Sequence, residues 1–495
     1  MSTTIGHYVG GTLLADAAGG EQISVLNPAT GEDLGRVRLD ATEAADRAVA
    51  AAAGAFESWA ATPVGERVQC LFRYKQVLED HFEELAALIV SEHGKTMGEA
   101  RGDVRRGIDC IEFACCAPVL MMGNTLPQIA VSSSFCRSED EGGIGIDSTS
   151  ERVPIGVCVG ITPFNFPIMV PLWMWPMAVA CGNTFVLKPS EKVPLSALRE
   201  LELTGEAGFP PGVINAVTGG ADVVNRLITH PDVRSVSFVG STKVAKHVYT
   251  TATAAGKRAQ CMGGAKNFMV IMPDADRDAV VEGVLGSAFG NTGQRCLAGS
   301  VAAPVGDAAD WFVPTIIEAA KGITVSRGDD PAVKMGPVID EASRERINSY
   351  IQIGVDEGAK LALDGRTAKI PQGGCFVGPS VFDHVKPTMR ICQEEIFGPV
   401  LSVVRCASLE DAIDALNSTD YGNMGVIFTS SGYNARRFKT RARAGMIGVN
   451  VGVPAPMAVF PFAGWKNSFF GDLHANGEDA VRFYTEHKIL VTRWI

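Results

Sequence analysis

A cysteine in a turn of small residues is the first candidate for covalent chemistry. Cys296 lies in segment 291–300 (NTGQRCLAGS), directly after Arg295 and between glycines. Glycine lets the backbone approach a ligand closely, and a neighbouring guanidinium favours the thiolate, which is the nucleophilic form of cysteine. Cys296 is therefore a candidate nucleophile. The alternative is a structural thiol, which more often occupies an apolar stretch.

A second unusual turn, segment 162–167 (TPFNFP), directly follows an apolar run. Its two prolines restrict the backbone on both sides of Asn165, so the side-chain amide could donate a hydrogen bond to an oxyanion from a fixed position. The simpler interpretation is that Asn165 satisfies the backbone of its own turn.

Two further segments are suited to a dinucleotide. Lys188 and Glu191, in the segment KPSE, end another apolar run, where they could bind ribose hydroxyls. Ser241, in the segment FVGST, precedes a helical pattern whose first amides could bind a pyrophosphate. A solvated strand end has the same composition, so each signal is weak by itself.

Signatures of other chemistries are absent from the sequence. It contains no G-x-G-x-x-G, G-x-x-x-x-G-K-[ST], H-E-x-x-H or G-x-S-x-G motif, and its eight histidines are dispersed. Metal, P-loop and serine-hydrolase sites are therefore not indicated by any of these motifs, and we predict no metal.

Strand and helix patterns alternate along the chain and predict the elements that would position these residues. Helical periodicity covers 42–59, 64–93 and 97–122, and β-rich runs at 157–161, 184–187, 213–217 and 236–239 each precede a helical pattern. A second such series begins near residue 268 and continues to about residue 450. This alternation is typical of parallel sheets built from βαβ units. We predict two α/β domains in sequence, after a small antiparallel element at the N-terminus.

Composition narrows the class of protein and its partners. The chain has 495 residues, 46% hydrophobic content and a net charge of −11, which describe a globular protein of two to four domains. So acidic a chain has no general electrostatic basis for binding nucleic acid or an anionic membrane. Its twelve cysteines form no C-x-x-C pair, and residues 1–20 lack a signal-peptide pattern. We therefore expect a reduced, cytoplasmic location.

Two segments need separate interpretation. No charged residue lies between Arg152 and Lys188, but five prolines interrupt this stretch, which predicts a buried strand, a core helix and a second buried strand instead of a membrane span. Residues 132–150 form the one polar, low-complexity island. They could be an exposed β-arm or a loop, and composition favours the loop.

Together and in order, these segments closely resemble the aldehyde dehydrogenase superfamily along nearly the whole chain. The resemblance covers PFNFP, KPSE, FVGST, GQRC, the segment 394–400 (EEIFGPV) and the segment 445–450 (GMIGVN). It implies a fold of two doubly wound α/β domains, one of them a Rossmann-like NAD domain, with a β-arm for oligomerisation. It places the NAD-binding domain in 1–131 and 153–262, the catalytic domain in 263–460, and the arm with its C-terminal strand in 132–152 and 478–495.

The resemblance also implies roles for individual residues. Cys296 would attack the aldehyde, and Asn165 would stabilise the oxyanion. The positions at which the family binds NAD are Thr162, Phe164, Lys188, Glu191, Lys192, Ser241, Gly263, Glu395 and Phe397. The implied assembly is a homo-oligomer, a dimer or a tetramer.

One departure from the family pattern concerns the second half of the reaction. Hydrolytic members carry a glutamate in E-L-G-G-K, whereas this chain reads QCMGGAKN, with Cys261 at the glutamate position and no carboxylate from Arg258 to Pro273. Water needs a general base to attack a thioester, but a thiol with a pKa near 8.5 supplies its own anion far more readily. The departure favours acyl transfer to coenzyme A.

Other local sequence is similar to the methylmalonate-semialdehyde dehydrogenase branch, in which arginines matching Arg106 and Arg295 bind the substrate carboxylate. The implied activity is NAD-dependent, CoA-acylating oxidation of malonate or methylmalonate semialdehyde to acetyl-CoA or propionyl-CoA. The preferred semialdehyde and the occurrence of decarboxylation stay open. The alternatives are a hydrolytic aldehyde dehydrogenase with a different base and a catalytically silent scaffold of the same fold. The segment GQRCL departs from the branch's usual GERCM, and segment 424–426 (MGV) also differs from the branch near the substrate cavity, which suggests a narrower or shifted aldehyde specificity.

Overall fold

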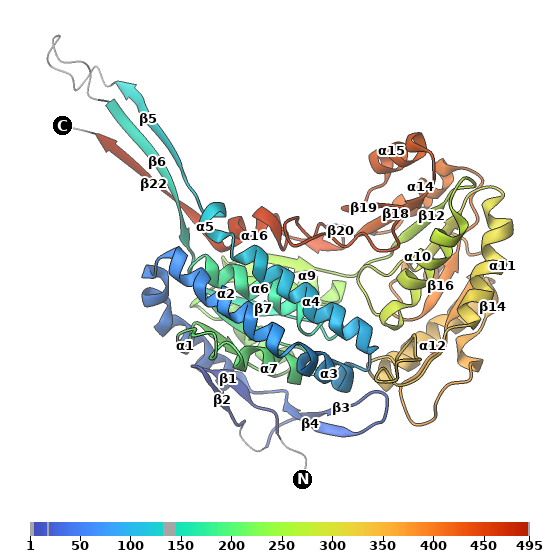
Figure 1. The fold of residues 1–495 in the computed structure, drawn as a ribbon, viewed down its shortest axis with the longest axis horizontal. Helices are drawn as coiled ribbons and strands as arrows, with labels where there is room; N and C mark the ends of the chain where they lie inside the picture. The colour runs from blue at the N-terminus through green and yellow to red at the C-terminus, as the bar shows by residue number, and fades with distance from the viewer. Residues whose placement is uncertain (1–3, 17–18, 132–144, 494–495) are drawn as a thin grey trace.

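Two large β-sheets, each covered by helices, form the body of the molecule (Figure 1). The computed structural model describes residues 4–16, 19–131 and 145–493. The sequence prediction of two α/β units in succession is confirmed, and their sheets are mostly parallel.

The first sheet has eight strands in the order β2-β1-β9-β8-β7-β10-β11-β21. Its five central strands run parallel, and β1 and β21 add antiparallel edges. The bounds are β1 (His7–Val9), β2 (Thr12–Leu14), β7 (Val157–Ile161), β8 (Thr184–Lys188), β9 (Ile214–Ala216), β10 (Val233–Val239), β11 (Arg258–Met262) and β21 (Phe469–Phe470). The chain order reverses between β7 and β10, which is where doubly wound sheets bind ligands.

Helices cover both faces of this sheet (Figure 1). They are α1 (Thr42–Ala61), α2 (Val64–Asp80), α3 (Phe82–His93), α4 (Met97–Ala114), α5 (Ala117–Leu120), α6 (Met169–Ala180), α7 (Pro194–Glu202), α8 (Ala221–Thr229), α9 (Thr242–Ala254) and α16 (Gly477–Tyr484). The uncharged segment predicted as strand, core helix and strand forms β7, α6 and β8, and every residue of these three elements is buried. Within the described residues, every helix is too short or too polar to cross a bilayer.

The second sheet has seven strands in the order β14-β15-β16-β13-β12-β18-β19, all parallel except β14. Its strands are β12 (Phe268–Ile271), β13 (Val301–Pro304), β14 (Lys360–Leu363), β15 (Ser380–Asp383), β16 (Val400–Val403), β18 (Met424–Phe428) and β19 (Met446–Val449). The helices that follow its strands are α10 (Arg277–Phe289), η1 (Gly290–Gly293), α11 (Ala308–Lys321), α12 (Glu341–Asp356), η2 (Gly365–Thr367), α13 (Arg390–Gln393), α14 (Leu409–Asn417) and α15 (Gly432–Arg441).

A three-stranded arm extends from the first unit (Figure 1). In it β6 (Gly145–Pro154) pairs antiparallel with β5 (Asn124–Val131) and with β22 (Thr485–Arg493). The preference for a loop over 132–150 is therefore wrong for residues 145–150, because strand pairing overrides a polar composition; residues 132–144 lie outside the described part of the chain. Two smaller antiparallel pairs are β3 (Gln22–Leu26) with β4 (Asp33–Arg38), and β17 (Tyr421–Gly422) with β20 (Trp465–Lys466).

Candidate active site

A cavity of about 480 Å³ brings together the predicted nucleophile and both predicted carboxylate-binding arginines. Arg106 comes from α4, and Arg295 and Cys296 come from the loop after η1. The rest of the wall is largely apolar and includes Phe166, Trp173 and the 453–458 segment. The cavity can hold a small acyl group with a charged end.

The cysteine loop is held by backbone geometry that few residues tolerate. Asn291 and Thr292 adopt left-handed φ values of 51° and 55°. Gly293, with φ of 69°, passes so close to the carbonyl of Gly398 that any side chain would collide with it. The carbonyl of Cys296 accepts hydrogen bonds from the side-chain amides of Asn267 and Asn423, both at 2.9 Å. These contacts fix the loop against the second sheet.

The thiol of Cys296 is strongly biased toward its neutral form. Burial raises its pKa to about 12, and the negative charge of Glu395 adds to this effect. The amides of Cys296 and Leu297 and the charge of Arg295 act in the opposite direction but do not compensate. Arg295 therefore lowers the pKa of this thiol in the expected direction, but desolvation raises the pKa by more than the guanidinium lowers it.

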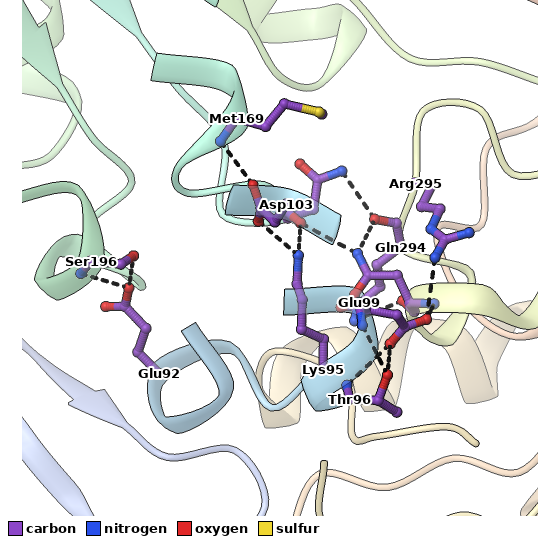
Figure 2. A network of polar contacts seen from close by, with 11 residues as sticks. Glu92, Lys95, Thr96, Glu99, Asp103, Met169, Ser196, Gln294 and Arg295 are labelled. Atoms are coloured by element: carbon purple, nitrogen blue, oxygen red, sulfur yellow. Dashed lines mark hydrogen bonds and ion pairs between the residues drawn. The ribbon is translucent and has the colours of Figure 1, made fainter. Parts of the chain in front are cut away.

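The turn that carries Asn165 is fixed by a buried ion pair (Figure 2). Lys95 Nζ lies 3.1 Å from Asp103 Oδ2 and donates to the backbone carbonyl of Asn165 at 2.7 Å. The other oxygen of Asp103 accepts from the amide of Met169 at 2.8 Å. Both charged side chains are fully buried. The Asn165 side chain in turn donates through Nδ2 to the carbonyl of Gln294 at 3.0 Å, so the two predicted catalytic loops are in direct contact.

The predicted NAD residues gather where β7, β8 and β10 end. Thr162 follows β7, and its amide donates to the carbonyl of Lys188 at the end of β8. Lys188 pairs with Glu191 at 2.7 Å. Ser241 precedes α9 and makes no side-chain cap, so a ligand oxygen can take that place at the helix N-terminus.

Aromatic and charged groups form the opposite side of this region. Phe164 packs edge-on against Phe397, with ring centroids 5.8 Å apart, and Lys192 Nζ lies 5.5 Å from the Phe164 ring. Lys192 also pairs with Asp340 at 2.6 Å. Phe397 itself adopts a left-handed φ of 55°. The two rings connect the first unit to the second.

The turn between β11 and β12 joins this region to Glu395. Gly263 donates its amide to the carbonyl of Ser468, and a side chain on Gly263 would lie 2.8 Å from the carbonyl of Asn467. Glu395 accepts from the amide of Ala265 at 2.9 Å, and burial raises the pKa of its carboxyl to about 7. Cys261, at the position of the family's glutamate, is fully buried in β11 among apolar side chains and has no surface in the cavity.

The sequence reasoning missed the residues that hold these loops. Lys95 and Asp103 carry no local motif, because their partners are distant in sequence. Glu99 could have been found, since Thr96-x-x-Glu99 has the capping-box pattern and forms one at the start of α4. Asn267 and Asn423 show no signal in the sequence; their roles depend on the position of the Cys296 carbonyl.

Comparison with known proteins agrees with this architecture. Residues 15–490 match the aldehyde dehydrogenase family. The chain is 51% identical over 492 residues to malonate-semialdehyde dehydrogenase 1 of Geobacillus thermodenitrificans, with 99% of each chain covered. The methylmalonate-semialdehyde dehydrogenase of Oceanimonas doudoroffii superposes with a TM-score of 0.95 at 46% identity, covering 100% of this chain and 99% of that one. A Sinorhizobium meliloti protein assigned to the same activity, solved with NAD, gives a TM-score of 0.94 at 42% identity over 100% and 99% of the chains.

Removing one charge of the buried pair should be costly. The substitution Asp103→Asn leaves Lys95 without a counter-charge in a fully buried position, so we expect the free energy of unfolding to fall by about 3–5 kcal/mol in urea titrations. The double variant K95M/D103N carries no buried charge and should be less destabilised than the sum of its single variants. A stability for Asp103→Asn within about 0.5 kcal/mol of the parent protein would contradict this account.

The high pKa of Cys296 predicts a steep pH dependence of alkylation. Below the pKa of a thiol, its thiolate fraction rises about tenfold per pH unit. We expect the rate at which iodoacetamide alkylates Cys296 in the ligand-free protein to keep rising from about pH 7 to about pH 10. Mass spectrometry of the peptide that contains Cys296 measures this rate. Cys296→Ser supplies the background from exposed Cys116. A plateau between pH 7 and 9 would show that the ligand-free thiol is already activated.

Proposed function

Because the chain belongs to the aldehyde dehydrogenase family, we propose that it oxidises malonate or methylmalonate semialdehyde with NAD and transfers the acyl group to coenzyme A. The observation that carries the proposal is one cavity lined by Cys296, Arg295 and Arg106, while Cys261, at the position of the family's glutamate, is a thiol buried in β11 outside the cavity lining. The two arginines fit a substrate carboxylate, since a guanidinium can bind one bidentately.

The residues at the ends of β7, β8 and β10 fit NAD. Ser241 leaves the N-terminus of α9 without a side-chain cap, which suits a pyrophosphate, and the Lys188–Glu191 pair suits ribose hydroxyls. Phe164 and Phe397 provide apolar faces beside them. When bound, NAD accepts the hydride of the reaction.

The chemistry begins at Cys296. Its sulfur adds to the aldehyde carbon and its proton passes to solvent, which gives a thiohemiacetal oxyanion. Only one acceptor, the Gln294 carbonyl, is bonded to Asn165 Nδ2 in the described structure, so the second amide hydrogen can face this oxyanion. Loss of the hydride converts the adduct to a thioester. The thiolate of coenzyme A then replaces Cys296, which recovers its proton.

Glu395 gives the hydrolytic alternative a specific candidate base. It is the carboxylate whose charge acts on Cys296, and its pKa of about 7 suits a proton acceptor. Against this role, one carboxylate oxygen is already bonded to the amide of Ala265, and the side chain lies outside the lining of the cavity that contains Cys296. Family resemblance assigns Glu395 to the cofactor, so we propose acyl transfer as the main reaction. The intact nucleophile loop, amide and cofactor residues argue against a catalytically silent scaffold.

We further propose the division of the chain that the resemblance implies. The parallel strands of the eight-stranded sheet all come from 153–262, and all strands of the seven-stranded sheet come from 263–460, which supports an NAD-binding domain and a catalytic domain. The pairing of β6 with β22 supports an oligomerisation arm, and β5 joins the same sheet. Ile489, Leu490 and Val491 on β22 are more than half exposed, as expected of a surface covered by a second copy.

The remaining proposals concern surroundings and partners. The free state of all eleven described cysteines supports a reduced, cytoplasmic location. The net charge of −11 supports the proposal that neither nucleic acid nor an anionic membrane is a partner.

Dependence on coenzyme A tests the reaction type. With semialdehyde and NAD alone, we expect one burst of NADH, equivalent to about one turnover, and then a stall that ends when coenzyme A is added. Mass spectrometry of the product then separates acetyl-CoA or propionyl-CoA from malonyl-CoA or methylmalonyl-CoA, which shows whether the carboxylate is lost. Equal steady-state rates with and without coenzyme A, with free acid as the product, would sink the acylating claim.

Gly102 tests whether the α4 wall is the substrate pocket. It lies mid-helix, lines the cavity between Glu99 and Arg106, and a side chain there would meet no atom within 4 Å. Gly102→Ala should stabilise the protein by about 0.5–1 kcal/mol, as glycine is a poor helix former, yet lower kcat/KM several-fold by narrowing the cavity.

The matched control for Gly102→Ala is Gly54→Ala in α1, an equally open site outside the cavity lining. It should give a similar gain in stability without a change in kcat/KM. Unchanged kinetics in Gly102→Ala would place the substrate elsewhere.

A further inference from the structure

One carboxylate, that of Glu99, connects the start of α4 to the cysteine loop (Figure 2). Its Oε2 accepts from the amide and the hydroxyl of Thr96, at 3.1 and 3.0 Å. Its Oε1 accepts from the backbone amide of Asn291 and lies 3.2 Å from Nη2 of Arg295. Each carboxylate oxygen therefore has two partners. Two of these four partners, the Asn291 amide and the Arg295 guanidinium, lie in the loop that ends at Cys296.

Arg295 is held at both ends of its guanidinium. Nη2 pairs with Glu99, and Nη1 donates to the carbonyl of Gly286 at 3.3 Å. The guanidinium also packs so closely on Gly290 that a side chain there would lie 2.5 Å from Nη1. The Arg295 side chain is 21% exposed and that of Glu99 is 17% exposed, so solvent screens this pair only in part. The arginine is thus fixed on the cavity wall before any ligand arrives.

Arg106 is the contrasting case on the same wall. It is exposed, and its guanidinium forms no hydrogen bond or ion pair with any described residue. Its charge still acts on Arg295, and Asp109 on the same helix lies within electrostatic reach of it. The cavity therefore presents one fixed and one free guanidinium.

We propose that Glu99 is a positioning residue that orients Arg295 toward the substrate carboxylate and so sets the preference for semialdehydes that carry one. The inference rests on the proposed function and deepens it. A long, flexible side chain loses rotamer freedom when it binds a ligand, and holding it in advance removes that cost from binding. Glu99 also offsets the repulsion between the two guanidiniums while the cavity is empty.

The competing explanation is that Glu99 only caps α4. Glu99→Gln separates the two, because glutamine at this position can still form a capping box but removes the negative charge next to Arg295. We expect kcat/KM for malonate semialdehyde to fall about tenfold, mainly through KM, which is the effect of weakening one charge-assisted contact. For propanal, which lacks the carboxylate, kcat/KM should fall by a clearly smaller factor, because only the contact with the Asn291 amide, and not the charge beside Arg295, matters for this aldehyde.

Thr96→Ala is the matched control. It removes the hydroxyl that caps α4 but leaves the Glu99–Arg295 contact in place. The variant should therefore have lower thermal stability, while the ratio of kcat/KM for the two aldehydes stays unchanged. An equal fall for both aldehydes in Glu99→Gln, or no fall for either, would overturn the positioning role. If the parent enzyme itself shows no preference for malonate semialdehyde over propanal, the proposed function fails, and this outcome is seen before any variant is made.

Discussion

The buried pair of Lys95 and Asp103 is the interaction on which the active site depends. Charges without access to water are stable only when their partners are complete, and here Lys95 also donates to the Asn165 carbonyl while Asp103 accepts the Met169 amide. The pair therefore holds the 162–169 turn against α4. Glu99, one turn before Asp103 on that helix, holds the cysteine loop. The 162–169 turn and the cysteine loop belong to different sheets, yet both are held in place by contacts with one helix, α4.

This arrangement explains how side chains from two units can be held in fixed positions around one cavity. The Asn165 amide reaches the carbonyl of Gln294, while Asn267 and Asn423 hold the carbonyl of Cys296 from the second sheet. Backbone carbonyls on both sides of the reactive position are occupied, so the loop cannot rotate without losing several hydrogen bonds. Burial in this setting raises the pKa of the thiol, which favours its neutral form.

The elements were largely predictable from the sequence, whereas the contacts between them were not. β7 forms over Val157–Ile161 as predicted, because a short apolar run between turn signals leaves few alternatives. Strand β6 was missed in part, because its pairing with β22 joins residues more than 300 positions apart. The Lys95–Asn165 contact is hidden for the same kind of reason, since its partners are 70 positions apart. The raised pKa of Cys296 could not be predicted, because the sequence shows Arg295 next to the thiol but not the burial around it.

The central claim is that Cys296 carries an acyl group that water cannot remove well and coenzyme A can. The most direct measurement is mass spectrometry of the Cys296 peptide after the enzyme is mixed with malonate semialdehyde and NAD and then quenched in acid. We predict an acyl adduct on Cys296 that persists without coenzyme A and disappears when it is added. Absence of the adduct during continued NADH formation would contradict the account.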